Sequence, residues 1–143
     1  MKKMLKFFQL SFIPTSTDLG LLVLRVWVGL SMVILHGWPK VSGYSSMLEK
    51  WQDPLGIGNQ PSLIGAIFGE LVCAGLVVLG LATRFAALVC VFTMGVAFFI
   101  AHKGVLKGPM NGEMAFIYMA AFATLFFAGP GKLSIDAKLG GAK

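Results

Sequence analysis

Residues 61–102 read PSLIGAIFGELVCAGLVVLGLATRFAALVCVFTMGVAFFIAH. This stretch holds two apolar runs, 61–81 and 84–102, each close to the roughly 20 residues that cross a bilayer as a helix. Only Ala82 and Thr83 separate the runs. Because so short a link leaves no room for a crossing connection, we expect two antiparallel membrane helices joined as a hairpin.

Two further apolar runs flank this hairpin, at residues 18–38 and 112–129. The first is expected to end at Gly37-Trp38-Pro39-Lys40, and the last at Gly129-Pro130-Gly131. Residues 41–60, rich in proline and glycine, are expected to form the only long loop. The predicted fold is therefore all-α: one transmembrane domain over residues 1–143, built as an antiparallel four-helix bundle with short loops.

Composition supports a membrane protein and argues against a soluble one. Hydrophobic residues make up 57% of the chain and charged residues 13%, against about a quarter in soluble domains. So few charges cannot cover a soluble surface, so lipid is the expected partner of the exterior. The net charge of +6 comes mostly from cations at the ends of the apolar runs, without a basic cluster interleaved with aromatics. This pattern argues against nucleic acid as a partner.

The distribution of cations predicts the orientation of the chain. Seven fall on the side of both termini, and four fall on the opposite side. The first group is Lys2, Lys3, Lys6, Arg84, Lys132, Lys138 and Lys143, and the second is Lys40, Lys50, Lys103 and Lys107. Since cytoplasmic loops of membrane proteins carry the excess of Lys and Arg, both termini are expected to be cytoplasmic.

Two charged residues fall inside the predicted spans. Arg25 lies in the first helix and Glu70 at the centre of the second. A charge at such depth costs several kcal/mol unless it is paired and faces the bundle interior. We therefore expect an Arg25–Glu70 ion pair, which either fixes the helix register or forms a proton or anion site.

A second polar group is expected at the extracytoplasmic edge, where His36, His102 and Glu113 end or begin three helices. His36 shares a helical face with Arg25, so it is expected to point inward. The hypothesis is a pocket in which the three residues bind a ligand and transfer protons. They are also candidate ligands for a metal ion, the two histidines for a b-type haem, and all three could bind a quinone. The alternative is that they are ordinary polar residues at helix ends.

Redox motifs are absent from the sequence. Cys73 and Cys90 lie in separate apolar runs and form no CxxC pair, which argues against a thioredoxin-like site or a zinc ribbon. The sequence also has no flavin, nucleotide or iron–sulfur motif. Any redox chemistry would therefore need a bound quinone, a metal or a partner subunit.

The order of short motifs resembles a known family. The first helix reads LLVLRVWVGLSMVILHGWPKV, the hairpin GELVCAGLVVLGLATRFAALVCVFTMGVAFFIAH, and the last part NGEMAFIYMAAFATLFFAGPGKLSID. Together they resemble the DoxX family of small four-helix bacterial membrane proteins over about residues 21–136. The positions that carry the resemblance are Arg25, His36, Glu70, Arg84, His102, Glu113 and residues 129–131.

That resemblance implies a place in the bacterial inner membrane and a function in a redox system. The family takes its name from a membrane subunit of an archaeal thiosulfate:quinone oxidoreductase, and other members are associated with oxidative-stress defence. It implies a quinone-linked membrane subunit that works with a redox partner, and the chain could also form a homo-oligomer. The alternatives are a non-enzymatic binding or assembly protein and, with little room in four helices, a small-solute transporter.

Overall fold

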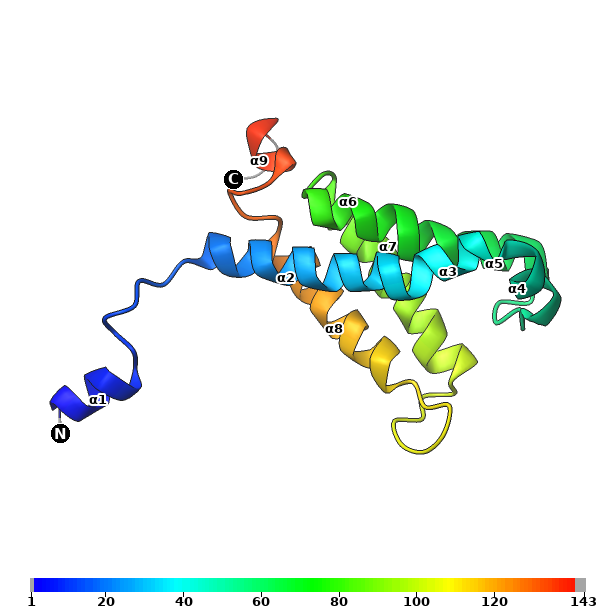
Figure 1. Cartoon of the computed structure of the whole chain (residues 1–143), viewed down its shortest axis with the longest axis horizontal. Helices are drawn as coiled ribbons and strands as arrows, with labels where there is room; N and C mark the ends of the chain where they lie inside the picture. The colour runs from blue at the N-terminus through cyan, green and yellow to red at the C-terminus, as the bar shows by residue number, and fades with distance from the viewer. Residues whose placement is uncertain (1, 141–143) are drawn as a thin grey trace.

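The computed structural model describes residues 2–140, and within this range every regular element is a helix (Figure 1). The all-α prediction is confirmed. Lys143, which was counted among the cytoplasmic cations, lies outside the described residues.

Four long apolar segments make up the bundle, and three of them contain a π-helical turn. They are α2 (Thr17–Met32), η1 (Val33–Gly37) and α3 (Trp38–Ser42); α5 (Asn59–Ile67), η2 (Phe68–Cys73) and α6 (Ala74–Leu79); α7 (Thr83–Gly95) and η3 (Val96–Ala101); and α8 (Glu113–Ala128). The first three segments are long and apolar enough to cross a membrane, whereas α8 has only 16 residues.

Predicted boundaries lie within about two residues of the observed ones, except at the end of the first helix. There the helical segment runs through Pro39 to Ser42. The Trp38 amide donates to the Val33 carbonyl, five residues back, and Pro39 occupies the first turn of α3. A proline in that position is tolerated because its missing N–H is not needed there. The expected loop 41–60 also contains a helix, α4 (Tyr44–Lys50).

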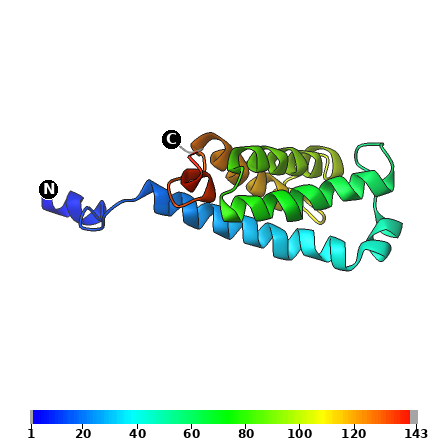
Figure 2. The same ribbon diagram turned by 90° about the horizontal axis from the view of Figure 1, so that it is seen from above.

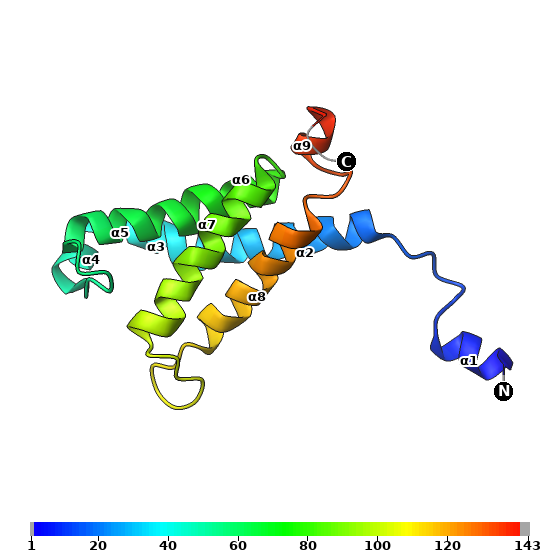
Figure 3. The same cartoon turned by 180° about the vertical axis from the view of Figure 1, so that it is seen from behind.

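Two short helices outside the bundle were not predicted, α1 (Lys2–Phe8) and α9 (Ile135–Lys138). They lie at the same end of the bundle as the turn between α6 and α7 (Figures 1 and 2). We call this the inner end. The opposite, outer end carries α4 and the connection over residues 102–112 (Figure 3).

The helices pack as two pairs. The segment that begins with α2 lies along the segment α5–η2–α6, and α7 lies along α8. The pairs meet through α6, η2 and α7 and diverge toward the outer end (Figures 1 and 3). Small residues allow the closest approaches: a Cβ on Gly37 would lie 2.7 Å from the Glu70 carbonyl oxygen, and a Cβ on Gly69 would collide with the Thr93 hydroxyl. The first contact lies within one pair, whereas the second joins the two pairs at the point from which they diverge.

Small and aliphatic side chains fill the space where the pairs meet. Ala74, Val77, Ala86 and Ala87 are fully buried there, together with the free thiol of Cys73. The exterior is also apolar but carries large side chains: Trp27, Phe92 and Phe127 are more than 60% exposed. An exposed apolar belt around a small-residue core is the arrangement expected of a lipid-embedded bundle.

Candidate functional site

The expected Arg25–Glu70 ion pair does not form, and this prediction is wrong. The Glu70 carboxylate instead pairs with the Lys40 ammonium at 2.5 Å. Arg25 directs its guanidinium toward the inner end. There the guanidinium donates to the carbonyl oxygens of Pro130, at 3.1 Å, and Leu133. Both side chains are long enough to find partners other than the residue at their own depth, which helix position alone could not indicate.

Arg25 belongs to a structural assembly at the inner end. It anchors residues 129–138, which we call the C-terminal clasp, while Asp18 accepts a hydrogen bond from the Lys132 amide at 2.8 Å. At the far end of the clasp, the two carboxylate oxygens of Asp136 accept from the amides of Ala82 and Thr83 at 2.7 and 2.9 Å. The clasp therefore ties α2 to the turn between α6 and α7.

Arg84, at the same end, holds α7 to α8. Its Nε donates to the Phe126 carbonyl at 3.0 Å, and its guanidinium carbon lies 5.3 Å from the centre of the Phe126 ring. The hydrogen bond and the cation–π contact are both local, so Arg84 is a packing residue at this end of the bundle.

The divergence of the two helix pairs leaves a cavity of about 650 Å³ in the outer half. Titratable side chains reach its lining from three of the long segments: His36 of η1 and Lys40 of α3, Glu70 of η2, and Tyr118 of α8. His102, directly after η3, is the fifth titratable residue, and the lining also contains the polar side chains of Gln52, Ser62, Thr93 and Asn111. Residues of the 51–58 loop, including Trp51 and Ile57, cover the cavity on its outer side, and most of the remaining wall is apolar.

Each π-helical turn of the bundle places a titratable residue at this cavity. Glu70 lies within η2 and His36 within η1, and His102 follows the last residue of η3. The amide after each turn bonds five residues back, for example from His102 to the Ala97 carbonyl at 3.0 Å. A π-turn widens the helix and rotates the following side chains, and such turns are frequent at functional sites. Three of them around one cavity indicate a site rather than a packing defect.

Three ring groups in the cavity have hydrogen-bonding capacity that the described residues do not use. His102 Nδ1 lies 2.7 Å from the Ala97 carbonyl oxygen, which can only accept, so Nδ1 carries the proton and Nε2 is left as an acceptor in the neutral ring. The His36 ring meets Tyr118 edge to face, with 5.4 Å between ring centres. Within residues 2–140, the His36 nitrogens and the Tyr118 hydroxyl have no hydrogen-bond partner, although Tyr118 is only 7% exposed.

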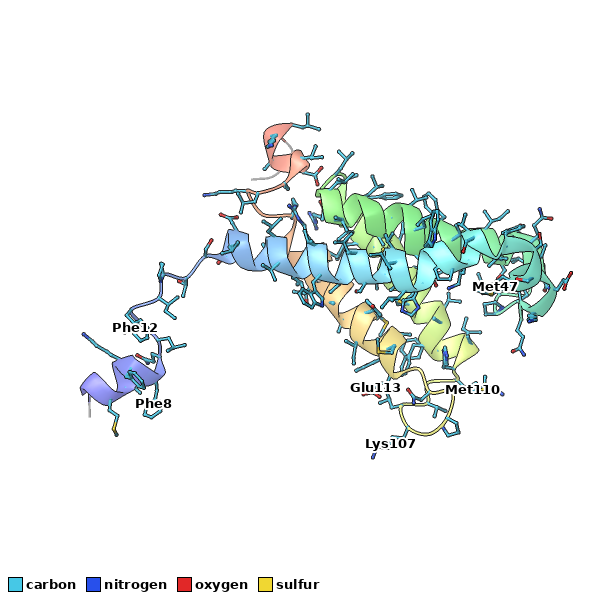
Figure 4. All side chains as sticks on the ribbon, viewed as in Figure 1. Phe8, Phe12, Met47, Lys107, Met110 and Glu113 are labelled. Carbon is cyan, nitrogen blue, oxygen red and sulfur yellow. The ribbon has the colours of Figure 1, made fainter. Side chains whose placement is uncertain are left out.

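Glu113 does not join the two histidines. It is exposed at the start of α8, outside the cavity lining, and lies on the outer rim near Lys107 and Met110 (Figure 4). The predicted trio of His36, His102 and Glu113 is therefore wrong in its third member. The reason is that helix phase turns Tyr118, five residues further along α8, into the cavity instead. Among the described residues no three His, Cys, Asp or Glu side chains gather as a metal site, so the trio is not a metal centre.

Sequence reasoning missed Lys40 and Tyr118 as site residues. Lys40 follows His36 by four positions, which places both on one helical face once the helix is known to continue past Pro39. Tyr118 is the single phenol in α8, a helix that is apolar apart from Glu113, Tyr118 and Thr124, and a buried tyrosine hydroxyl usually has a partner. No comparable sequence feature indicated that the loop over residues 51–58 covers the cavity.

Most of the cavity residues lie in a region that matches a known protein family. The model of the DoxX family matches residues 20–103, more than half of the chain, and includes every cavity side chain described above except Asn111 and Tyr118. A relative from Haemophilus influenzae, described as an uncharacterized protein, is 34% identical over 112 residues, which is 75% of this chain and 81% of the relative. No solved structure matches.

Proposed function

Because the chain belongs to the DoxX family of membrane proteins, we propose that its outer cavity binds the ring of a quinone or quinol within the bilayer. The observation that supports this most strongly is the set of ring groups without protein partners. His36, His102 and Tyr118 present hydrogen-bonding atoms to an otherwise mostly apolar cavity. A quinone has the complementary form, an apolar ring with an oxygen at each of two opposite edges.

The size and lining of the cavity favour a small organic ligand. About 650 Å³ falls within the range of roughly 300–1,000 Å³ typical of small-molecule sites. Such sites combine apolar walls with a few polar groups that fix orientation. The Lys40–Glu70 pair adds no net charge to this cavity, which favours a neutral ligand over an inorganic anion.

The polar groups can serve both redox forms of such a ligand. The Tyr118 hydroxyl can donate to a quinone carbonyl, and His102 Nε2 can accept from a quinol hydroxyl. Imidazole nitrogens can accept and donate protons, so His36 and His102 are suited by residue type to take up or release the protons that accompany quinone reduction. We assign this proton exchange to the two histidines and the orientation of the ring to Tyr118.

The proposed membrane placement puts this cavity on the extracytoplasmic side of a bacterial inner membrane. All four long segments span the bilayer in alternating directions, and the inner end with both termini is cytoplasmic. At 1.5 Å per residue, the 16 residues of α8 extend about 24 Å, which is short of a ~30 Å core but close enough for local thinning of the bilayer. The excess of cations at the inner end supports this orientation.

In this function the chain is the quinone-facing subunit of a membrane oxidoreductase, of the thiosulfate:quinone type by family resemblance. The sequence offers no flavin, nucleotide or iron–sulfur motif, so a redox partner subunit would exchange electrons with the quinone. The alternative, a binding or assembly protein without redox function, would use the same cavity for recognition alone.

Titration calorimetry of the purified protein with a benzoquinone whose ring carries only methyl and methoxy groups tests the proposal. We expect saturable binding at one site per chain, weakened about 5- to 13-fold by His102→Ala and by Tyr118→Phe, since each removes one hydrogen bond of about 1–1.5 kcal/mol in a site of low polarity. Glu113→Gln is the matched control and should leave the affinity unchanged, because Glu113 lies outside the cavity. Equal affinities for all four proteins would overturn the proposed site.

A further inference from the structure

The cavity has two kinds of boundary: the 51–58 loop on its outer side, and exposed residues of two helical segments on one flank of the bundle. Over its outer side, Trp51 Nε1 donates to the Ser62 hydroxyl at 3.1 Å. The Asp53 carboxylate accepts from the amides of Leu55 and Gly58 at 3.0 and 2.6 Å. These bonds tie the 51–58 loop into a compact cover that is attached to the start of α5.

On one flank of the bundle, cavity-lining residues stand on both sides of the gap between the α5–η2 segment and α7, next to the point where Gly69 and Thr93 are in contact. The two segments diverge from that point toward the outer end (Figures 1 and 3). Five cavity-lining residues stand along this gap: Gly65, Ala66 and Phe68 on the outer side of the contact, and Val89 and Phe92 just before Thr93 on α7. We call this set the lateral portal.

The portal combines open space with exposed aromatic edges. Gly65 is exposed, and a Cβ added to it would meet no other atom within 4 Å. Phe68 and Phe92 are 44% and 64% exposed on the two sides of the gap. In the proposed membrane placement, lipid surrounds the bundle at this depth, so the gap lies next to the hydrocarbon of the bilayer.

We propose that the ligand of the cavity is an amphiphile with one long apolar chain, which enters sideways from the bilayer and leaves its chain in the lateral portal. The inference rests on the proposed function and adds the class of ligand and its route. The polar ring would reach His36, His102 and Tyr118 in the interior, while the chain passes between Phe68 and Phe92 into lipid. A water-soluble ligand would need the opposite arrangement, with an open outer side and a closed lipid side.

This arrangement has a particular consequence for affinity. An apolar chain gains little by leaving lipid for an apolar groove, because both surroundings are equally free of water. The portal therefore accommodates ligands that carry a chain. It does not raise their binding affinity in proportion to chain length. An obstruction in the portal should exclude such ligands while the ring site itself stays intact.

Two glycines provide a matched test of the portal. Gly65→Phe fills the gap, whereas Gly75→Phe places the same side chain on α6, outside the cavity lining, where a Cβ also meets no atom within 4 Å. Each variant and the wild type, in lipid nanodiscs, is titrated with two probes. One is a dimethoxy-methyl-benzoquinone with a decyl chain, and the other is the same ring without the chain.

We expect Gly65→Phe to weaken binding of the decyl probe at least tenfold and to leave binding of the chain-free ring within about twofold, with Gly75→Phe like wild type for both. Unchanged binding of the decyl probe by Gly65→Phe would overturn the portal and leave the ring site standing. Equal loss of both probes would also overturn it, because the substitution would then have disturbed the whole cavity. Failure of the wild type to bind either probe would overturn the proposed function and this inference with it.

Discussion

Substitutions in the Lys40–Glu70 ion pair test most clearly whether Glu70 pairs with Lys40, as in this structure, or with Arg25, as the sequence suggests. The side chains of Lys40 and Glu70 are 14% and 8% exposed, so each charge would be left largely buried if its partner were removed. Breaking a fully buried pair from one side costs about 3–5 kcal/mol. Because both side chains retain some access to solvent through the cavity, we expect about 2–3 kcal/mol from either Lys40→Met or Glu70→Gln.

The double variant should be far less destabilised than the sum of the single variants, because it leaves no unpaired charge behind. We expect a coupling energy of about 1.5–2.5 kcal/mol, measured by equilibrium unfolding of the purified protein in mixed micelles of detergent and SDS. A second cycle with Arg25→Met and Glu70→Gln is the control, and its effects should add to within about 0.5 kcal/mol because these residues share no contact. Additive effects for Lys40 and Glu70, or strong coupling between Arg25 and Glu70, would refute the pairing described above.

Two further expectations concern the C-terminal clasp at the inner end. Arg25→Met removes charged hydrogen bonds to the Pro130 and Leu133 carbonyls. We therefore expect a loss of about 2–4 kcal/mol in unfolding free energy and faster proteolysis after residue 129. Proteolysis of the clasp at the wild-type rate would contradict its anchoring by Arg25. Partial burial raises the pKa of Asp136, but hydrogen bonds from Thr83 and Ala82 and the charge of Arg25 outweigh it and hold the pKa below the ordinary 3.8. Its contribution to stability is thus fully present above pH 3.8 and is lost as the pH falls through the lower folded-state pKa. Asp136→Asn should flatten this part of the stability profile, and an unchanged acid limb would show that the carboxylate does not hold the clasp.

The sequence predicted the helices well because their signal is local. Runs of about twenty apolar residues, interrupted by glycine, proline and charge, identify membrane helices without knowledge of their partners. The same locality explains the misplaced end of the first helix. Proline in a helix depends on the hydrogen-bond register around it, and the π-turn at Val33–Gly37 that sets this register has no simple sequence signature.

The candidate site was predicted only in part, because its geometry depends on helix rotation and on partners distant in sequence. His36 and His102 were expected at one end of the bundle, and both line the cavity. The prediction for Glu113 was wrong because the depth of a residue in the membrane does not determine the helix face on which its side chain lies. The partner of Glu70 was missed because Lys40 was read as an interfacial cation, although its flexible chain reaches inward from α3.

The residues that carry the family resemblance divide into two groups in the structure. Arg25 and Arg84 hold the inner end together, and the glycines around Pro130 let the chain turn back toward Arg25. His36, Glu70 and His102 line the cavity of the outer half. The family positions therefore divide between contacts that hold the inner end together and side chains that line the outer cavity, where we propose that the ligand binds.

Photolabelling with an azido-substituted quinone in nanodiscs, followed by peptide mapping, is the most direct measurement of whether the outer cavity binds a quinone ring. We expect labels on η1 and α8 near His36 and Tyr118 and on the 51–58 loop, all suppressed by excess unlabelled quinone. Trp27, which is 76% exposed on α2, provides the reference for non-specific labelling from the lipid. Labels confined to Trp27 and other lipid-facing residues, or cavity labels that excess quinone does not suppress, would contradict the proposed function.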